Sequence, residues 1–69
     1  MLSVYVDLRG RRYSIEQDLT TGTYLAVRPC FRGMRVRRFR TAGEAMRWLR
    51  RLVPGGLRLE EEGESNAER

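Results

Sequence analysis

Apolar and polar residues alternate along the first forty positions in a way that predicts four strands. A period of two is typical of strands that bury one face. The predicted strands cover residues 2–8, 13–19, 24–28 and 34–39. The turns between them are short, and short connections imply antiparallel neighbours. The residues expected on the core side are Leu2, Val4, Val6, Leu8, Tyr13, Ile15, Leu19, Leu25, Val27, Met34 and Val36.

Two details of this pattern are more local. Pro29 should end the third strand, because proline cannot donate to a central ladder. The alternation in the fourth strand slips at Arg37-Arg38, which favours a β-bulge there.

The period changes after Phe39, where a helix of about 12 residues is expected. Thr41 and Glu44 have the spacing of a capping box, and Pro54-Gly55-Gly56 should end the helix. The apolar stripe consists of Ala42, Ala45, Met46, Leu49, Leu52 and Val53. The predicted fold is therefore α+β: an antiparallel four-stranded meander followed by one helix packed on one face (ββββα). Leu57 and Leu59 could add a short edge strand.

The charges divide the chain into two parts. Residues 1–59 contain 13 arginines and 4 acidic residues, which gives a net charge near +9 and predicts a single basic α+β domain. Residues 60–69 contain five glutamates and one arginine, and we expect an acidic, disordered tail. This tail would aid solubility, or it would compete with a polyanion for the basic surface.

The strongest functional signal is a run of six arginines between residues 28 and 40. Because apolar residues are interleaved with them, the run predicts a folded basic hairpin that binds a polyanion, with DNA favoured over RNA and duplex over single strands. All 14 basic residues are arginine, whose guanidinium group suits phosphate and guanine recognition. A very GC-rich genome, which favours arginine codons, is the alternative explanation for the absence of lysine.

In the predicted register Tyr24, Arg28, Arg35 and Arg37 share the open face of the sheet. Phosphate neutralisation by the arginines, with Tyr24 stacking or packing on sugar, is the expected mechanism. The complete candidate nucleic-acid-binding set is Tyr24, Arg28, Arg32, Arg35, Arg37, Arg38 and Arg40. An ordinary solvated sheet face is the alternative interpretation.

A second candidate surface lies on the helix. Trp48 flanks the apolar stripe, and Arg47 and Arg51 lie on the opposite side of the helix. Trp48 should pack partly in the core, or else these three residues contact a protein or a second copy of the chain. They would then serve the alternative function, a protein-binding regulator (antitoxin-like or a phage-encoded inhibitor) that docks an acidic protein surface. An obligate dimer with no ligand of its own is a third possibility.

The composition argues against catalysis and cofactors. One cysteine, Cys30, and no histidine leave no internal disulfide, no metal site and no thiol–base pair, so we expect no enzyme activity, no cofactor and no small-molecule substrate. Asp7, Glu16 and Asp18 could face one another across the first hairpin and hold a magnesium ion, although solvated surface charge is the simpler interpretation. No long apolar run or signal peptide is present, so we expect a cytoplasmic protein without a membrane partner.

The segment from Gly33 to Leu49 resembles the Arm-type DNA-binding domain of phage and transposon integrases, through Phe39, Thr41, Glu44 and Ala45. That family places a three-stranded sheet in the major groove. The resemblance implies that outward residues of 24–28 and 34–40 contact DNA.

Two further resemblances involve other parts of the chain. Residues 4–15 are similar to the first hairpin of the single-stranded DNA-binding coactivator fold, which is dimeric through its helix. The positions of Gly22, Tyr24, Pro29, Gly33, Thr41 and Glu44-Ala45 resemble HicB-type antitoxins. All three families are β-rich with one helix, so they agree on the fold more than on the function.

Overall fold

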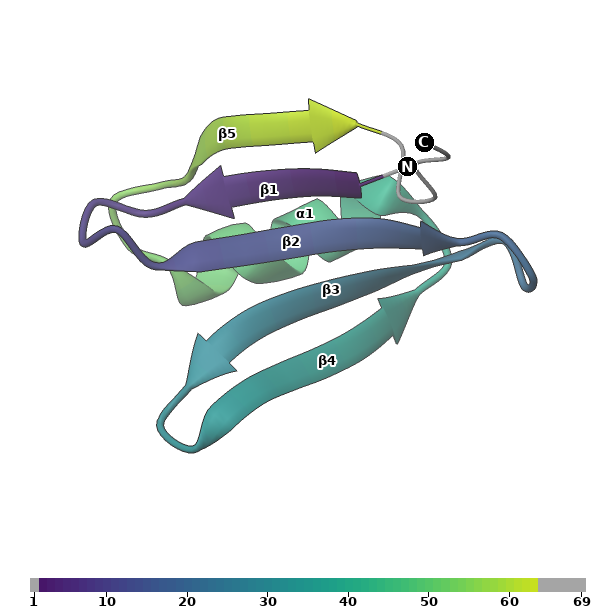
Figure 1. Cartoon of the computed structure of the whole chain (residues 1–69), viewed down its shortest axis with the longest axis horizontal. Coiled ribbons are helices and arrows are strands. Elements are labelled where there is room, and N and C mark those ends of the chain that lie inside the picture. The colour runs from purple at the N-terminus through teal and green to yellow at the C-terminus, as the bar shows by residue number, and fades with distance from the viewer. Residues whose placement is uncertain (1, 64–69) are drawn as a thin grey trace.

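The computed structural model describes residues 2–63, which form one antiparallel sheet with a helix on one side (Figure 1). The strands and the helix follow the order β1 (Leu2–Val6), β2 (Arg12–Asp18), β3 (Thr23–Cys30), β4 (Gly33–Phe39), α1 (Ala42–Leu52) and β5 (Arg58–Gly63). Across the sheet the order is β4-β3-β2-β1-β5. The predicted four-stranded meander followed by a helix is confirmed, and a fifth strand extends it.

The fifth strand starts at Arg58, where Leu57 and Leu59 allow a short edge strand, and continues into the predicted acidic tail. After α1 the chain turns at Gly55 and Gly56, whose φ angles of 93° and 89° favour glycine. It then pairs with β1 in antiparallel register, with a bulge at Val4/Tyr5. The boundary predicted at residue 60 is therefore wrong for residues 60–63, because backbone pairing with β1 orders them. The predicted disorder of residues 64–69 lies outside the described residues.

The helix begins as its capping sequence predicts. The Thr41 Oγ1 accepts a hydrogen bond from the backbone N–H of Glu44 at 3.1 Å, which satisfies one of the free donors of the first turn. Ala45, Leu49 and Val53 are buried and face the sheet. The spacing of four residues between them places all three on one side of the helix.

In β1, β3 and β4 the residues that face the helix are not the predicted ones but their neighbours on the other face of the strand. In β2 the prediction is confirmed, since Tyr13 and Ile15 are buried in the core. The cross-strand partner of Ile15 in β3 is Ala26, which is fully buried. Paired residues share a face, so the neighbouring Leu25 and Val27 lie on the face away from α1.

The same inversion affects β1 and β4. Ser3 and Tyr5 of β1 pair with Ile15 and Tyr13 and therefore face the helix. In β4 it is Arg37 that pairs with Ala26. The prediction that Leu2, Val4, Leu25, Val27, Met34 and Val36 form the helix-facing core is wrong, and Leu8 and Leu19 are exposed in turns. Val6 is buried as predicted, although it does not belong to the cluster packed on the helix.

Small side chains lie at the point where the helix meets β3. Ala26 and Ala45 are both fully buried in one core cluster, and two small side chains let the helix approach β3 closely. Three larger aromatic residues, Tyr24, Phe39 and Trp48, pack partly against the edge of that cluster.

Two local predictions about β3 and β4 also fail. These strands pair without a register shift from Tyr24–Phe39 to Cys30–Gly33, so no bulge occurs at Arg37-Arg38. Pro29 does not end β3, which continues to Cys30. The pairing of β3 with β2 ends at Val27, so Pro29 lies beyond the doubly paired part of its strand, where proline is tolerated.

Candidate nucleic-acid interface

The predicted arginines divide between the two faces of the sheet. Arg28, Arg35 and Arg37 share a face with Tyr24, as their spacing predicts. That face is not the open one, however, because it is the side on which α1 packs. Arg38 lies on the opposite face, paired with Leu25. The predicted seven-residue patch is therefore split, and its larger part lies beside the helix.

Arg37 and Trp48 form the centre of the helix-side part. The guanidinium carbon of Arg37 lies 5.4 Å from the centre of the Phe39 ring and 5.8 Å from that of Trp48. The two rings are themselves 5.5 Å apart and tilted by 48°. These distances are those of cation–π and aromatic contacts. The contacts hold the Arg37 side chain in place at the junction of β4 and α1.

An open groove runs along this junction and joins the hairpin surface to the helix surface, which the sequence predicts as two separate candidates. It is lined by Arg37, Phe39, Glu44, Arg47, Trp48 and Arg51. Arg47 and Arg51 are one helical turn apart, so they follow the groove on the α1 side. Three arginines and one carboxylate make the groove cationic. Arg37 of the hairpin candidates and the three helix candidates thus line one groove, although the sequence contains no signal that would join them.

Beyond the groove the same face continues with two arginines that are direct cross-strand partners. Arg28 in β3 pairs with Arg35 in β4. Neither forms an ion pair with a carboxylate that the structure describes, and the Nε of Arg28 is buried without a hydrogen-bond partner among the described residues. Like charges directly opposite each other destabilise a sheet. A bound anion would relieve this repulsion.

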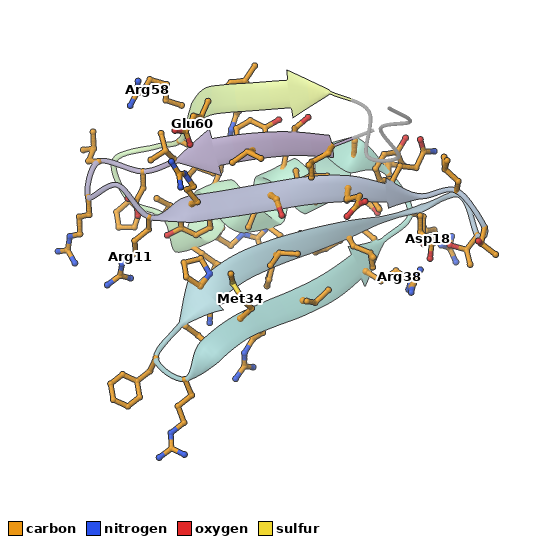
Figure 2. All side chains as sticks on the ribbon, in the orientation of Figure 1. Arg11, Asp18, Met34, Arg38, Arg58 and Glu60 are labelled. Atoms are coloured by element: carbon orange, nitrogen blue, oxygen red, sulfur yellow. The ribbon has the colours of Figure 1, made fainter. Side chains whose placement is uncertain are left out.

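Arg38 is held differently from these residues. Its Nη1 lies 3.2 Å from the Asp18 Oδ2 and also donates to the hydroxyl oxygens of Thr21 and Thr23. Together with the backbone N–H of Thr20, the hydrogen bond from Arg38 lowers the pKa of Asp18. Figure 2 shows Arg38 and Asp18 side by side at one end of the sheet. Arg38 is thus already neutralised within the fold.

Three predicted contacts remain. Arg32 is exposed in the β3–β4 turn, and Arg40 is exposed just before the helix cap. Tyr24 pairs with Phe39 and packs partly against the core, so it supports the aromatic contacts of the groove.

The face away from α1 is poorly suited to a polyanion. Its side chains include the carboxylates of Glu16 and Asp18 in β2 and of Glu60 in β5. Glu60 lies 2.9 Å from Arg12 Nε, and the hydrogen bond from this guanidinium lowers the pKa of Glu60. This is the face that the resemblance to integrase domains implies for DNA contact, and its acidic residues oppose that role.

Asp7 does not join Glu16 and Asp18, so the predicted arrangement of three facing carboxylates is wrong. It folds into the β1–β2 turn, where it accepts hydrogen bonds from the backbone N–H groups of Arg9 and Arg11 and from the Tyr13 hydroxyl. Burial favours the neutral acid, but these hydrogen bonds outweigh it and lower the pKa of Asp7. Among the described residues no group of three or more histidine, cysteine or acidic side chains could hold a metal ion.

The helix that carries part of the groove is far from the length a membrane span needs: within residues 2–63, no helix is long and apolar enough to cross a bilayer. No family model, curated protein or solved structure matches the chain, so its resemblances to integrase Arm-type domains, to the single-stranded DNA-binding coactivator fold and to HicB-type antitoxins stay predictions.

Proposed function

We propose that this protein binds nucleic acid, with duplex DNA as the preferred form, through the helix-side face of β3 and β4 and the adjoining flank of α1. The observation that carries the proposal is that five arginines lie on one side of the molecule and form no ion pair with a described carboxylate. These are Arg28, Arg35, Arg37, Arg47 and Arg51. Such a surface attracts phosphates at long range and releases their counterions on contact.

The aromatic residues favour phosphate contact over base stacking. Trp48 is half-buried, and its ring already contacts Phe39 and the guanidinium of Arg37. A nucleobase would have to displace Arg37 to stack there. Arg37 in its present position instead offers its remaining N–H donors to a phosphate. Duplex DNA, whose phosphates are exposed and whose bases are stacked, therefore suits the groove better than a single strand does.

Adjacent arginines provide a matched test. Arg37 and Arg38 are consecutive, but Arg37 lies in the groove and Arg38 is paired with Asp18 on the other face. We expect Arg37→Ala to weaken binding of a labelled duplex and to reduce the slope of log affinity against log salt by about 0.9, the value for one lost phosphate contact. Arg38→Ala should leave the slope unchanged.

Fluorescence anisotropy with duplex and single-stranded oligonucleotides at several salt concentrations measures both quantities. Equal slopes for the two variants would exclude the groove as the contact. Absence of salt-dependent binding to either oligonucleotide would reject the function itself and leave an acidic protein surface as the partner of the arginines.

A further inference from the structure

We propose that the open face of the sheet is the interface of a homodimer in which two copies pack sheet against sheet. This proposal does not depend on nucleic-acid binding, because the arginine groove lies on the other side of the molecule. It also differs from the dimer contact expected from the sequence, which was Trp48 with its helix neighbours.

The open face carries a mainly apolar stripe, interrupted by one serine, on the side of the sheet away from α1. The stripe runs across four strands through the cross-strand partners Val36, Val27, Ser14 and Val4. Leu25 and Met34 extend it on either side, and Figure 2 shows Met34 in front of the sheet with the helix behind. Met34 is 69% exposed and Val36 is 56% exposed. Contiguous exposed apolar residues on a small domain indicate an interface.

The set of buried residues on the helix side is small. Leu49 is the one large side chain that is fully buried among the described residues, and the core cluster contains six residues. Small domains with such limited cores commonly need a partner. A layer on the second face would turn a one-sided sheet into the buried centre of a dimer.

The size of the face fits a weak, reversible dimer. Five strands spaced about 4.8 Å apart, each about six residues long at about 3.3 Å per residue, cover roughly 500 Å² per copy. Two copies would bury about 1,000 Å² together, which is the size of a weak biological interface. Neither copy would cover the arginine groove of the other.

The charged residues of the open face favour a second copy of the chain as the binding partner. Glu16 lies on one side of the apolar stripe, while Arg12 and Arg58 lie on the other side with Glu60. If a two-fold axis runs along the stripe, each strand lies over the same strand of the other copy and runs in the opposite direction. Glu16 of each copy then faces the Arg12 of the other copy, since both lie in β2, two residues either side of Ser14. Self-complementarity of this kind is what an isologous interface requires.

Sedimentation equilibrium of the full chain without nucleic acid tests the proposal. We expect a dimer at about 50 µM for the native sequence, in the concentration range of modest interfaces. Val36→Glu should raise the dissociation constant at least about tenfold, since it places a carboxylate in the apolar stripe. Phe31→Glu is the matched control: Phe31 is 97% exposed at the tip of the same hairpin, off the stripe. It should remain dimeric.

Met34→Glu serves as a second variant, because this side chain is more exposed than Val36 and its replacement should not disturb the monomer. Circular dichroism verifies that each variant is folded. A native chain that is monomeric at this concentration would overturn the proposal. So would folded Val36→Glu and Met34→Glu variants that dimerise as strongly as Phe31→Glu.

Discussion

The Arg37 guanidinium carbon lies 5.8 Å from the centre of the Trp48 ring, so a strand residue and a helix residue eleven positions apart form one contact. Trp48 is the single tryptophan of the chain, and its fluorescence therefore reports on the groove directly. The contact also connects the binding proposal to a signal that can be measured in the free protein.

Removal of this guanidinium should change the tryptophan emission. We expect Arg37→Ala to shift the emission of the free protein to longer wavelength, because water replaces the cation over a half-buried ring. Arg38→Ala should leave the spectrum as it is, since Arg38 lies on the other face. Identical spectra for native protein and Arg37→Ala would contradict the stacked geometry.

Replacement of leucine by alanine should lower the free energy of unfolding more at Leu49 than at Leu52. Leu49 is fully buried, whereas Leu52 is 39% exposed. Leu49→Ala should lower the free energy of unfolding by about 2–4 kcal/mol, and Leu52→Ala by less than about 1.5 kcal/mol. Urea denaturation followed by circular dichroism measures both. Equal losses would mean that the helix does not face the sheet through Leu49.

Glycine replacements should have opposite signs at two positions. Gly55 has a φ of 93°, so Gly55→Ala should destabilise the turn into β5 by about 1 kcal/mol or more. A Cβ there would also lie 3.0 Å from Leu8 Cδ1, a flexible exposed side chain that can move. Gly43→Ala, in the first helical turn and free of close contacts, should stabilise by about 0.5–1 kcal/mol. Thermal unfolding of the two variants against native protein decides the signs.

Asp7 should make stability depend on acid pH. Its pKa is lower in the folded state than in the unfolded chain, because the hydrogen bonds from Arg11, Tyr13 and Arg9 favour the carboxylate. The contribution of Asp7 to the free energy of unfolding is therefore present above the unfolded pKa near 3.8. This contribution is lost as the pH falls through the lower pKa of the folded state.

Asp7→Asn should lower the melting temperature at neutral pH and reduce the acid dependence of melting. The remaining acid dependence would come from Asp18 and Glu60, whose pKa values are also lowered. An unchanged melting curve at pH 7 would show that the turn does not need the carboxylate.

The kind and order of the first five elements follow from local patterns in the chain. Alternation in residues 2–39, the Thr41 cap and the spacing of Ala45 and Leu49 are local properties, because strand and helix periods and a side-chain cap depend on neighbours a few residues away. The pairing of residues 60–63 does not follow from the sequence, because glutamate has a low propensity for strands. Backbone pairing with the neighbouring strand β1 orders these residues.

Which face meets the helix was decided by the tertiary structure alone. The residues 24–27 are apolar at both parities, so hydrophobicity cannot distinguish Leu25 and Val27 from Tyr24 and Ala26. The hairpin registers and the close approach of α1 over Ala26 decided it. That one choice placed Arg37 beside Trp48, separated it from Arg38, and left the aliphatic residues on the open face, because every side chain of a strand follows when its register is set.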